Sequence, residues 1–99
     1  MSRGGLKVGR ILVVDDEPAI LSLVERTLAG VGFDVQTATG GAAAVKMLQE
    51  HHFDLVVTDL FMPDVSGEDL LETIQQAGLD TDVLIMSGAG SIALAVDAM

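Results

Sequence analysis

Short apolar runs alternate with amphipathic segments along this chain. Three of the runs are rich in Val, Leu and Ile and end at acidic or turn-forming residues, which is typical of buried β-strands. A fourth segment, 34–38, is more polar but contains Val35 and Thr37, and we interpret it as a further short strand. In chain order the predicted strands are 11–14, 34–38, 55–59 and 83–86.

Apolar residues between these runs recur three and four positions apart, which predicts helices with one buried face. The first predicted helix starts at Pro18 after the acids Asp16 and Glu17, an arrangement typical of a helix N-terminus. Glycines at positions 30 and 32 stop this helix, because glycine readily adopts the conformation that ends helices. The other predicted helices cover 42–50, 67–77 and 91–99, the last with Ile92, Ala95, Val96 and Met99 on one face.

This alternation of strands and helices predicts right-handed strand–helix–strand units around a parallel sheet, and therefore an α/β fold. The chain has 99 residues, which is enough for one domain and too few for two. Residues 1–9 contain three glycines. We therefore predict a flexible lead-in over 1–9 and a single domain over 10–99.

The composition indicates a core without large aromatic side chains. Hydrophobic residues make up 49% of the chain, but Trp and Tyr are absent and Phe occurs three times, so the core must be aliphatic. Cysteine is absent, which excludes a disulfide framework and thiol chemistry.

Charge is distributed unevenly. Arg3, Lys7 and Arg10 lie in the first ten residues, which hold no acid. The rest of the chain carries all 15 acids against Arg26 and Lys46, a net charge of −13. Such a body should repel nucleic acid phosphates and attract a metal cation or a basic partner surface.

The first residues and the apolar runs indicate where in the cell the protein is expected. The first residues lack the apolar segment of a signal peptide. The longest apolar runs are too short to cross a bilayer. We therefore expect no membrane association and a cytoplasmic location.

Carboxylates follow two of the predicted strands. Asp15 and Asp16 come directly after 11–14, and Asp59 ends the strand 55–59. The carboxyl ends of parallel strands meet at one edge of the sheet, where ligands bind in open α/β folds. Three acids at that edge repel one another unless a cation lies among them. Mg²⁺, which prefers oxygen ligands, suits such a site.

Each of these acids also has a simpler interpretation. A single Asp at a strand end is more often a helix cap or turn former, and Asp16 could serve as both cap and ligand. The combination of all three acids is what favours a metal site.

Four motifs in sequence order carry a resemblance to a known family. One of them alone would be weak, whereas four in the same order, on alternating strands and helices, are specific. The chain from 11 to 99 resembles the receiver domain of two-component response regulators. The motifs are ILVVDDE at 11–17, FDLVVTD at 53–59, MPDVSG at 62–67 and LIMSG at 84–88.

The resemblance implies a fold, a reaction and a partner. The fold would be flavodoxin-like and doubly wound, with the strand order 2-1-3-4. Asp59 matches the phosphoacceptor, which takes a phosphoryl group from a histidine of a sensor histidine kinase. A carboxylate is a poor nucleophile, but it can accept a phosphoryl group when a metal neutralises the incoming oxygens. Asp15 and Asp16 match the acidic pair that binds Mg²⁺, together with Asp59 and the backbone carbonyl of Phe61. The chain would promote its own phosphorylation without being a turnover enzyme.

Ser87 matches the switch hydroxyl of the family, which moves to bond the phosphoryl group. A hydroxyl suits this role because it can rotate and donate to a phosphate oxygen. Pro63 and Gly67 are expected to shape the loop after the nucleophile, because Pro fixes φ and Gly permits unusual conformations.

Other polar residues near these motifs have simpler interpretations. We expect Thr58 to pack within its strand. Asp54 begins that strand, far from the acidic edge, so a turn or cap role is expected. Asp64 is interpreted as a solvated loop acid, although it could tune access to the site. His51 and His52 are interpreted as solvated, because no further His or Cys lies nearby.

The chain departs from the family at its C-terminal end. It stops at Met99, within the predicted fourth helix, so the resemblance implies that the fifth strand and fifth helix are missing. The lysine that ends the fifth strand would also be missing, which should weaken phosphorylation. The fourth strand would become a sheet edge, and Ile20, Leu23 or Leu28 would lose cover. We therefore expect a homodimer or a segment-exchanged oligomer.

These observations leave alternative functions open. The leading hypothesis is a phosphorylatable receiver, and the alternative is a phosphorylation-impaired module that only dimerises or docks a partner. A phosphatase with an aspartyl-phosphate intermediate is less favoured, because such enzymes commonly carry a second Asp where this chain has Phe61. Residues 86–99 are similar to receivers of bacterial enhancer-binding transcription activators, which suggests a link to transcription regulation. No DNA-binding segment is visible, so we expect no direct contact with nucleic acid.

Overall fold

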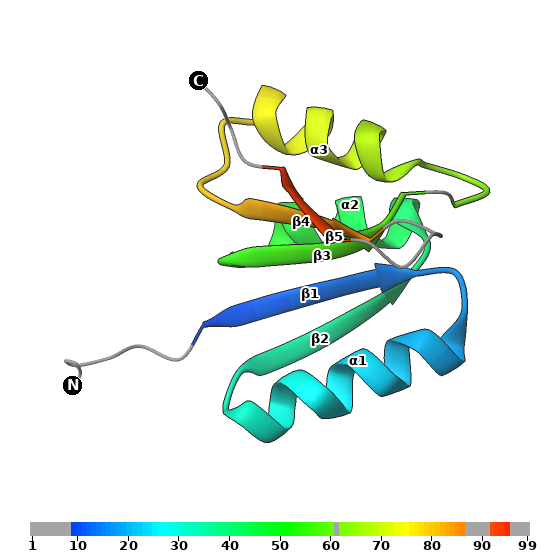
Figure 1. Ribbon diagram of the computed structural model, residues 1–99. Helices are drawn as coiled ribbons and strands as arrows, with labels where there is room; N and C mark the ends of the chain where they lie inside the picture. The colour runs from blue at the N-terminus through cyan, green and yellow to red at the C-terminus, as the bar shows by residue number, and fades with distance from the viewer. Residues whose placement is uncertain (1–8, 61, 87–91, 96–99) are drawn as a thin grey trace, which may run out of the picture.

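A five-stranded sheet forms the centre of the computed structural model, which describes residues 9–60, 62–86 and 92–95 (Figure 1). The strands are β1 (Arg10–Asp15), β2 (Asp34–Thr39), β3 (Leu55–Asp59), β4 (Asp82–Met86) and β5 (Ile92–Ala95). Their order in the sheet is β2-β1-β3-β4-β5. The strands β1 to β4 are parallel, so the predicted order 2-1-3-4 of a doubly wound α/β fold is confirmed.

Three helices connect the parallel strands: α1 (Pro18–Val31), α2 (Gly41–Glu50) and α3 (Gly67–Gln76). Pro18 occupies the first turn of α1 as predicted, and Gly32 ends the helix with a φ of 112°. The N-cap residue is the acid Glu17, but its side chain makes no capping hydrogen bond. No helix in the described part of the chain is long and apolar enough to cross a membrane.

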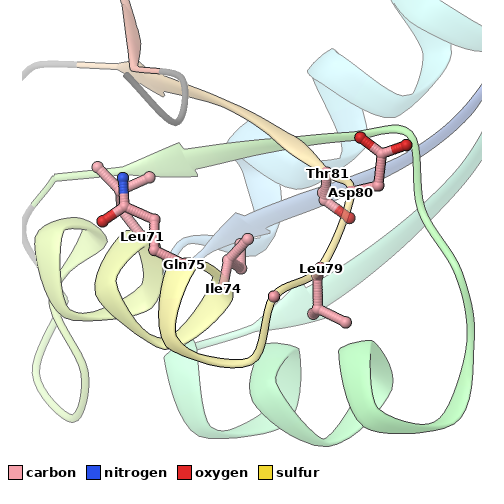
Figure 2. A pocket seen from close by; sticks show the side chains of 7 residues that line it. Leu71, Ile74, Gln75, Leu79, Asp80 and Thr81 are labelled. Carbon is pink, nitrogen blue, oxygen red and sulfur yellow. The ribbon is translucent and has the colours of Figure 1, made fainter. Parts of the chain in front are cut away.

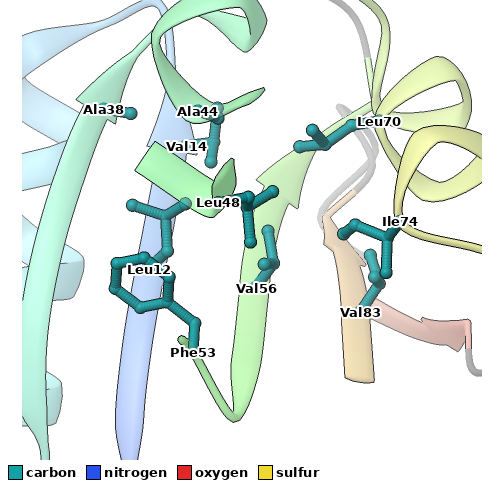
Figure 3. Packing of buried hydrophobic residues seen from close by; sticks show 10 residues of the cluster. All are labelled: Leu12, Val14, Ala38, Ala44, Leu48, Phe53, Val56, Leu70, Ile74 and Val83. Atoms are coloured by element: carbon teal, nitrogen blue, oxygen red, sulfur yellow. The ribbon is translucent and has the colours of Figure 1, made fainter. Parts of the chain in front are cut away.

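The larger part of the core lies between the sheet and the helices α2 and α3 (Figure 3). Alternate residues of β1 and single buried apolar residues of β2, β3 and β4 point to this face, and the apolar stripes of the two helices pack against them. Phe53, just before β3, is fully buried there, and the Arg10 guanidinium lies 5.3 Å from the centre of its ring. The buried members are otherwise aliphatic, as predicted: Leu12, Val14, Ala38, Ala44, Leu48, Val56, Leu70, Ile74 and Val83.

The opposite face of the sheet is covered by α1 alone among the described helices (Figure 1). Its core is smaller, with Ile11, Val13, Leu21 and Val57 buried. The apolar side chains around this core are only partly covered: Val24, Leu28, Val35, Leu55, Leu84 and Met86. Leu23 of α1 is 56% exposed, in agreement with the prediction that Ile20, Leu23 or Leu28 would lack cover.

The C-terminal segment differs from the prediction. A helix was expected over 91–99, but residues 92–95 form β5, which pairs antiparallel with β4 from Val83↔Ala95 to Met86↔Ile92. The outer edge of β4 offers unpaired backbone N–H and C=O groups, and an antiparallel strand satisfies them. The expectation that β4 forms the sheet edge is therefore wrong, because β5 covers it.

Candidate functional site

Three carboxylates meet where β1 and β3 end. The two strands are neighbours in the sheet, with Val14 of β1 paired with Thr58 of β3, so the residues that follow lie side by side. Carboxylate oxygens of Asp15, Asp16 and Asp59 all lie within 4.8 Å of one another. The structure therefore brings together the three acids that the sequence placed at one edge of the sheet, and we call them the acid cluster.

The members of the acid cluster differ in exposure. Asp15 is 4% exposed, Asp59 is half-buried and Asp16 is exposed. Burial raises the pKa of Asp15 above the usual 3.8, and the charges of Asp59 and Asp16 raise it further. A hydrogen bond from the Glu17 backbone N–H to Asp15 Oδ1, 2.9 Å long, opposes this shift. The metal-free cluster thus holds a charge that its surroundings disfavour.

A divalent cation fits this arrangement. The donor atoms are hard carboxylate oxygens close enough to share one ion, which is the ligand set that Mg²⁺ prefers. The ion pairs within the described part of the chain, Arg10–Asp34 and His52–Asp54, involve none of these acids. The described residues therefore supply no positive side chain to neutralise the cluster.

The loop after Asp59 packs closely against the end of β3. A Cβ on Gly67 would lie 2.6 Å from the Asp59 carbonyl oxygen, so only glycine fits there. The Gly67 N–H donates to the Leu60 carbonyl over 2.9 Å, and Ser66 Oγ accepts from the Asp69 N–H over 3.0 Å to cap α3. Gly67 therefore shapes the loop by allowing this close approach and not by the unusual conformation that was predicted, because it is not among the described glycines with a positive φ.

Asp64 was interpreted as a solvated loop acid, and the structure adds contacts that this interpretation missed. Its side chain is exposed, but its carboxylate accepts hydrogen bonds from three backbone N–H groups, those of Gly41, Ala42 and Val65. These bonds lower the pKa of Asp64 below the usual 3.8. Two of the donors begin α2, more than 20 residues earlier in the chain, so local sequence patterns gave no signal of this contact.

Among the remaining polar and metal-binding candidates, the structure describes Thr58 and Asp54. Thr58 is fully buried and its hydroxyl donates to the Asp59 carbonyl over 3.0 Å, which agrees with a packing role. Asp54 accepts from the Arg10 N–H over 2.8 Å at the start of the strands, as expected for a cap. Ser87 and Phe61 lie outside the residues that the structure describes.

A cavity of about 240 Å³ opens elsewhere in the molecule, between α3 and the segment that leads into β4 (Figure 2). The end of α3 and the start of β4 lie at the opposite edge of the sheet from the acid cluster. Asp80 is the only acid in the lining, so this cavity does not offer the converging carboxylates of the cluster. Its lining consists of Leu71, Ile74, Gln75, Gly78, Leu79, Asp80 and Thr81.

Comparison with known proteins places this geometry in context. The family model of the response regulator receiver domain matches residues 11–99. The chain is 39% identical over 90 residues to the response regulator protein PilR of Pseudomonas aeruginosa, covering 91% of this chain and 20% of PilR. It is 35% identical over 83 residues to the cell cycle transcriptional regulator CtrA of Caulobacter vibrioides, covering 84% of this chain and 36% of CtrA. The chain thus spans about a fifth to a third of these relatives.

Solved structures show the same fold. The response regulator TrrA of Thermotoga maritima, crystallised in complex with Mg²⁺-BeF, superposes with a TM-score of 0.77 at 35% identity, over 81% of this chain and 70% of TrrA. The receiver domain of the Francisella response regulator 1452 gives a TM-score of 0.78 at 28% identity, over 84% of this chain and 69% of that domain.

Proposed function

This chain belongs to the response regulator receiver domain family, and from that premise we propose that it accepts a phosphoryl group on Asp59. The observation that carries the proposal is the acid cluster. Its three carboxylates lie within 4.8 Å of one another at the edge of the sheet where ligands bind in open α/β folds. The donor would be a phosphohistidine of a sensor histidine kinase, in the cytoplasm.

In the proposed step, a carboxylate oxygen of Asp59 attacks the phosphorus atom of the phosphohistidine. A P–O bond forms to Asp59 as the P–N bond breaks, and the electron pair returns to the imidazole nitrogen, which takes a proton from water. The half-buried position of Asp59 leaves its carboxylate accessible to a partner's side chain. Only one phosphoryl group is held at a time, so the chain acts as a switch rather than a turnover enzyme.

Asp15 and Asp16 would hold Mg²⁺ beside Asp59, and we assign the Phe61 backbone carbonyl as a further ligand. A bound Mg²⁺ would neutralise charge on the phosphoryl oxygens. The near-complete burial of Asp15 fixes its carboxylate, while exposed Asp16 can contact the ion directly or through water. The complex of the related TrrA with Mg²⁺-BeF supports this assignment.

We assign Ser87 as the hydroxyl that bonds the phosphoryl group. It directly follows Met86, the residue of β4 that pairs with Asp59 of β3. A hydroxyl next to this pair could donate to a phosphoryl oxygen on Asp59.

Intact mass spectrometry tests the proposal. The protein is incubated with Mg²⁺ and acetyl phosphate, with Asp59→Asn and Asp54→Asn as parallel samples. We expect a gain of one phosphoryl group in the wild type and in Asp54→Asn, and no gain in Asp59→Asn. A folded wild-type protein that gains no phosphoryl group would contradict the proposal.

Self-association is a second candidate function, and the face of the sheet beside α1 favours it. Leu84 and Met86 are only partly buried there, and Leu23 of α1 is 56% exposed. A second copy of the chain could cover these side chains and form the homodimer or segment-exchanged oligomer. Light scattering at micromolar concentration tests this, and a purely monomeric species would count against it.

A further inference from the structure

Asp64 joins two segments that are distant in sequence. Its Oδ1 accepts from the N–H of Gly41 over 3.1 Å and from that of Val65 over 2.7 Å, and its Oδ2 accepts from the N–H of Ala42 over 3.0 Å. The N-cap residue of α2 is Gly40, which has no side chain to cap the helix. The loop after Asp59 thus supplies the cap that α2 itself lacks.

The same turn also contacts the strand that carries Asp15. The Gly40 N–H donates to the Asp15 carbonyl over 3.2 Å. Gly40 has a φ of 99°, which favours glycine, and a Cβ at Gly41 would overlap Val65 of the loop. The turn at Gly40 and Gly41 is therefore packed between the end of β1 and the loop that follows β3.

We propose that Asp64 is a positioning residue for the metal site, holding the loop after Asp59 against the Gly40–Gly41 turn and so fixing Asp59 relative to Asp15. This inference rests on the proposed Mg²⁺ site. The connection runs from Asp59 through the loop to Asp64, from there to the turn, and through Gly40 to the backbone of Asp15. Its basis is the set of hydrogen bonds at both ends of the turn.

The charge of Asp64 fits this role. Its three backbone hydrogen bonds lower its pKa, so it stays ionised at neutral pH. An ionised acid at the start of α2 is also favoured by the helix dipole. A neutral acceptor would make weaker bonds with the same N–H groups.

Calorimetric titration of the folded protein with Mg²⁺, at a temperature well below unfolding, tests the proposal. Asp64→Ala removes all three hydrogen bonds, and we expect it to weaken Mg²⁺ binding about tenfold, as for other residues that orient metal ligands. Asp64→Asn keeps an oxygen for Gly41 and Val65 but cannot accept from Ala42, so we expect a loss smaller than about tenfold. Both variants lose the same charge, so the difference between them reports the hydrogen bonds.

Asp54→Ala is the matched control, because Asp54 also accepts a backbone N–H, from Arg10, but at the other edge of the sheet. We expect this variant to bind Mg²⁺ like the wild type. Amide hydrogen exchange should show faster exchange of Gly41 and Ala42 in Asp64→Ala alone.

Two results would overturn the inference. In the first, Asp64→Ala exchanges these two amides faster yet binds Mg²⁺ as tightly as Asp64→Asn. In the second, Asp64→Ala does not fold, whereas Asp64→Asn folds and binds Mg²⁺ like the wild type. A wild-type protein that binds no Mg²⁺ would instead refute the metal site itself, and the inference with it.

Discussion

Acids lie at both ends of the parallel strands, where the strands begin and where they end, but the two groups of acids have different surroundings. At the edge where the strands begin, Asp34 lies 3.4 Å from the Arg10 guanidinium, and Asp54 accepts from the Arg10 N–H and lies 3.2 Å from His52. At the edge where the strands end, the acid cluster of Asp15, Asp16 and Asp59 contains only carboxylates. The described residues place no ion pair there.

This difference separates structural acids from functional ones. Asp34 and Asp54 have a basic side chain beside them, so they can stabilise the starts of the strands without a ligand. Like charges that share a small volume lower the stability of the folded protein unless a cation joins them. Clusters of this kind are therefore typical of functional sites. The presence of acids alone does not distinguish the acid cluster from the acids at the starts of the strands. The neighbouring side chains do, because they are basic at the strand starts and acidic in the cluster.

The largest expected contrast is in Mg²⁺ affinity. Asp15→Asn removes the most buried carboxylate of the cluster, and we expect Mg²⁺ binding to weaken by roughly 100-fold. Asp34→Asn removes an acid at the opposite edge and should leave the affinity unchanged. Isothermal titration calorimetry of both variants checks this, and equal losses in the two would erase the contrast.

Metal-free stability should change in opposite directions at the two edges. Asp59→Asn removes a like charge from the cluster, and we expect the free energy of unfolding to rise by about 1 kcal/mol, which raises the melting temperature by roughly 4–8 °C. Asp54→Ala loses the hydrogen bond from the Arg10 N–H, so we expect it to lower the free energy of unfolding. Thermal unfolding by circular dichroism in a chelator measures both, and a destabilised Asp59→Asn would contradict the account.

The pH dependence of stability gives a smaller contrast. The pKa of Asp15 is raised in the folded protein, so its contribution to stability is full below the usual 3.8 and is lost as pH rises through the raised pKa. Asp64, whose pKa is lowered, acts in the opposite direction, and its contribution is lost as pH falls. Asp15→Asn should therefore show a steeper gain of stability with rising pH than the wild type when denaturant unfolding is compared between pH 3 and 7 without metal.

The smallest effect is expected from the Arg10–Asp34 ion pair. Both side chains are substantially exposed, at 35% and 58%, so solvent screens the interaction. We expect Asp34→Asn to change the free energy of unfolding by less than about 0.5 kcal/mol. Denaturant unfolding at low and high salt measures this, and a change of several kcal/mol would contradict the claim that solvent screens this ion pair.

Much of the fold could be predicted because its signals are local. The four parallel strands, the start of α1 at Pro18 and its end at Gly32 follow from patterns within a few residues. The acid cluster was also predictable, because Asp15 and Asp59 each end an apolar run and parallel strands align their ends.

The errors concern contacts between distant segments. Residues 92–95 have a helical pattern, but the open edge of β4 decides their structure, and a pattern within the segment cannot show that edge. The cap that Asp64 provides to α2 depends on a contact across 22 and 23 residues. Propensity is a weak predictor where a tertiary contact of this kind decides the conformation.

The most direct test of the account is a Mg²⁺ titration of the ¹⁵N-labelled protein followed by amide chemical shifts. If the acid cluster is one cation site, the amides at the ends of β1 and β3, near Asp15 and Asp59, will shift together with a single dissociation constant. The amides near Asp34 and Asp54 will stay in place. Shifts spread equally over both edges, or confined to the edge where the strands begin, would contradict the claim that the unpaired acids form the site.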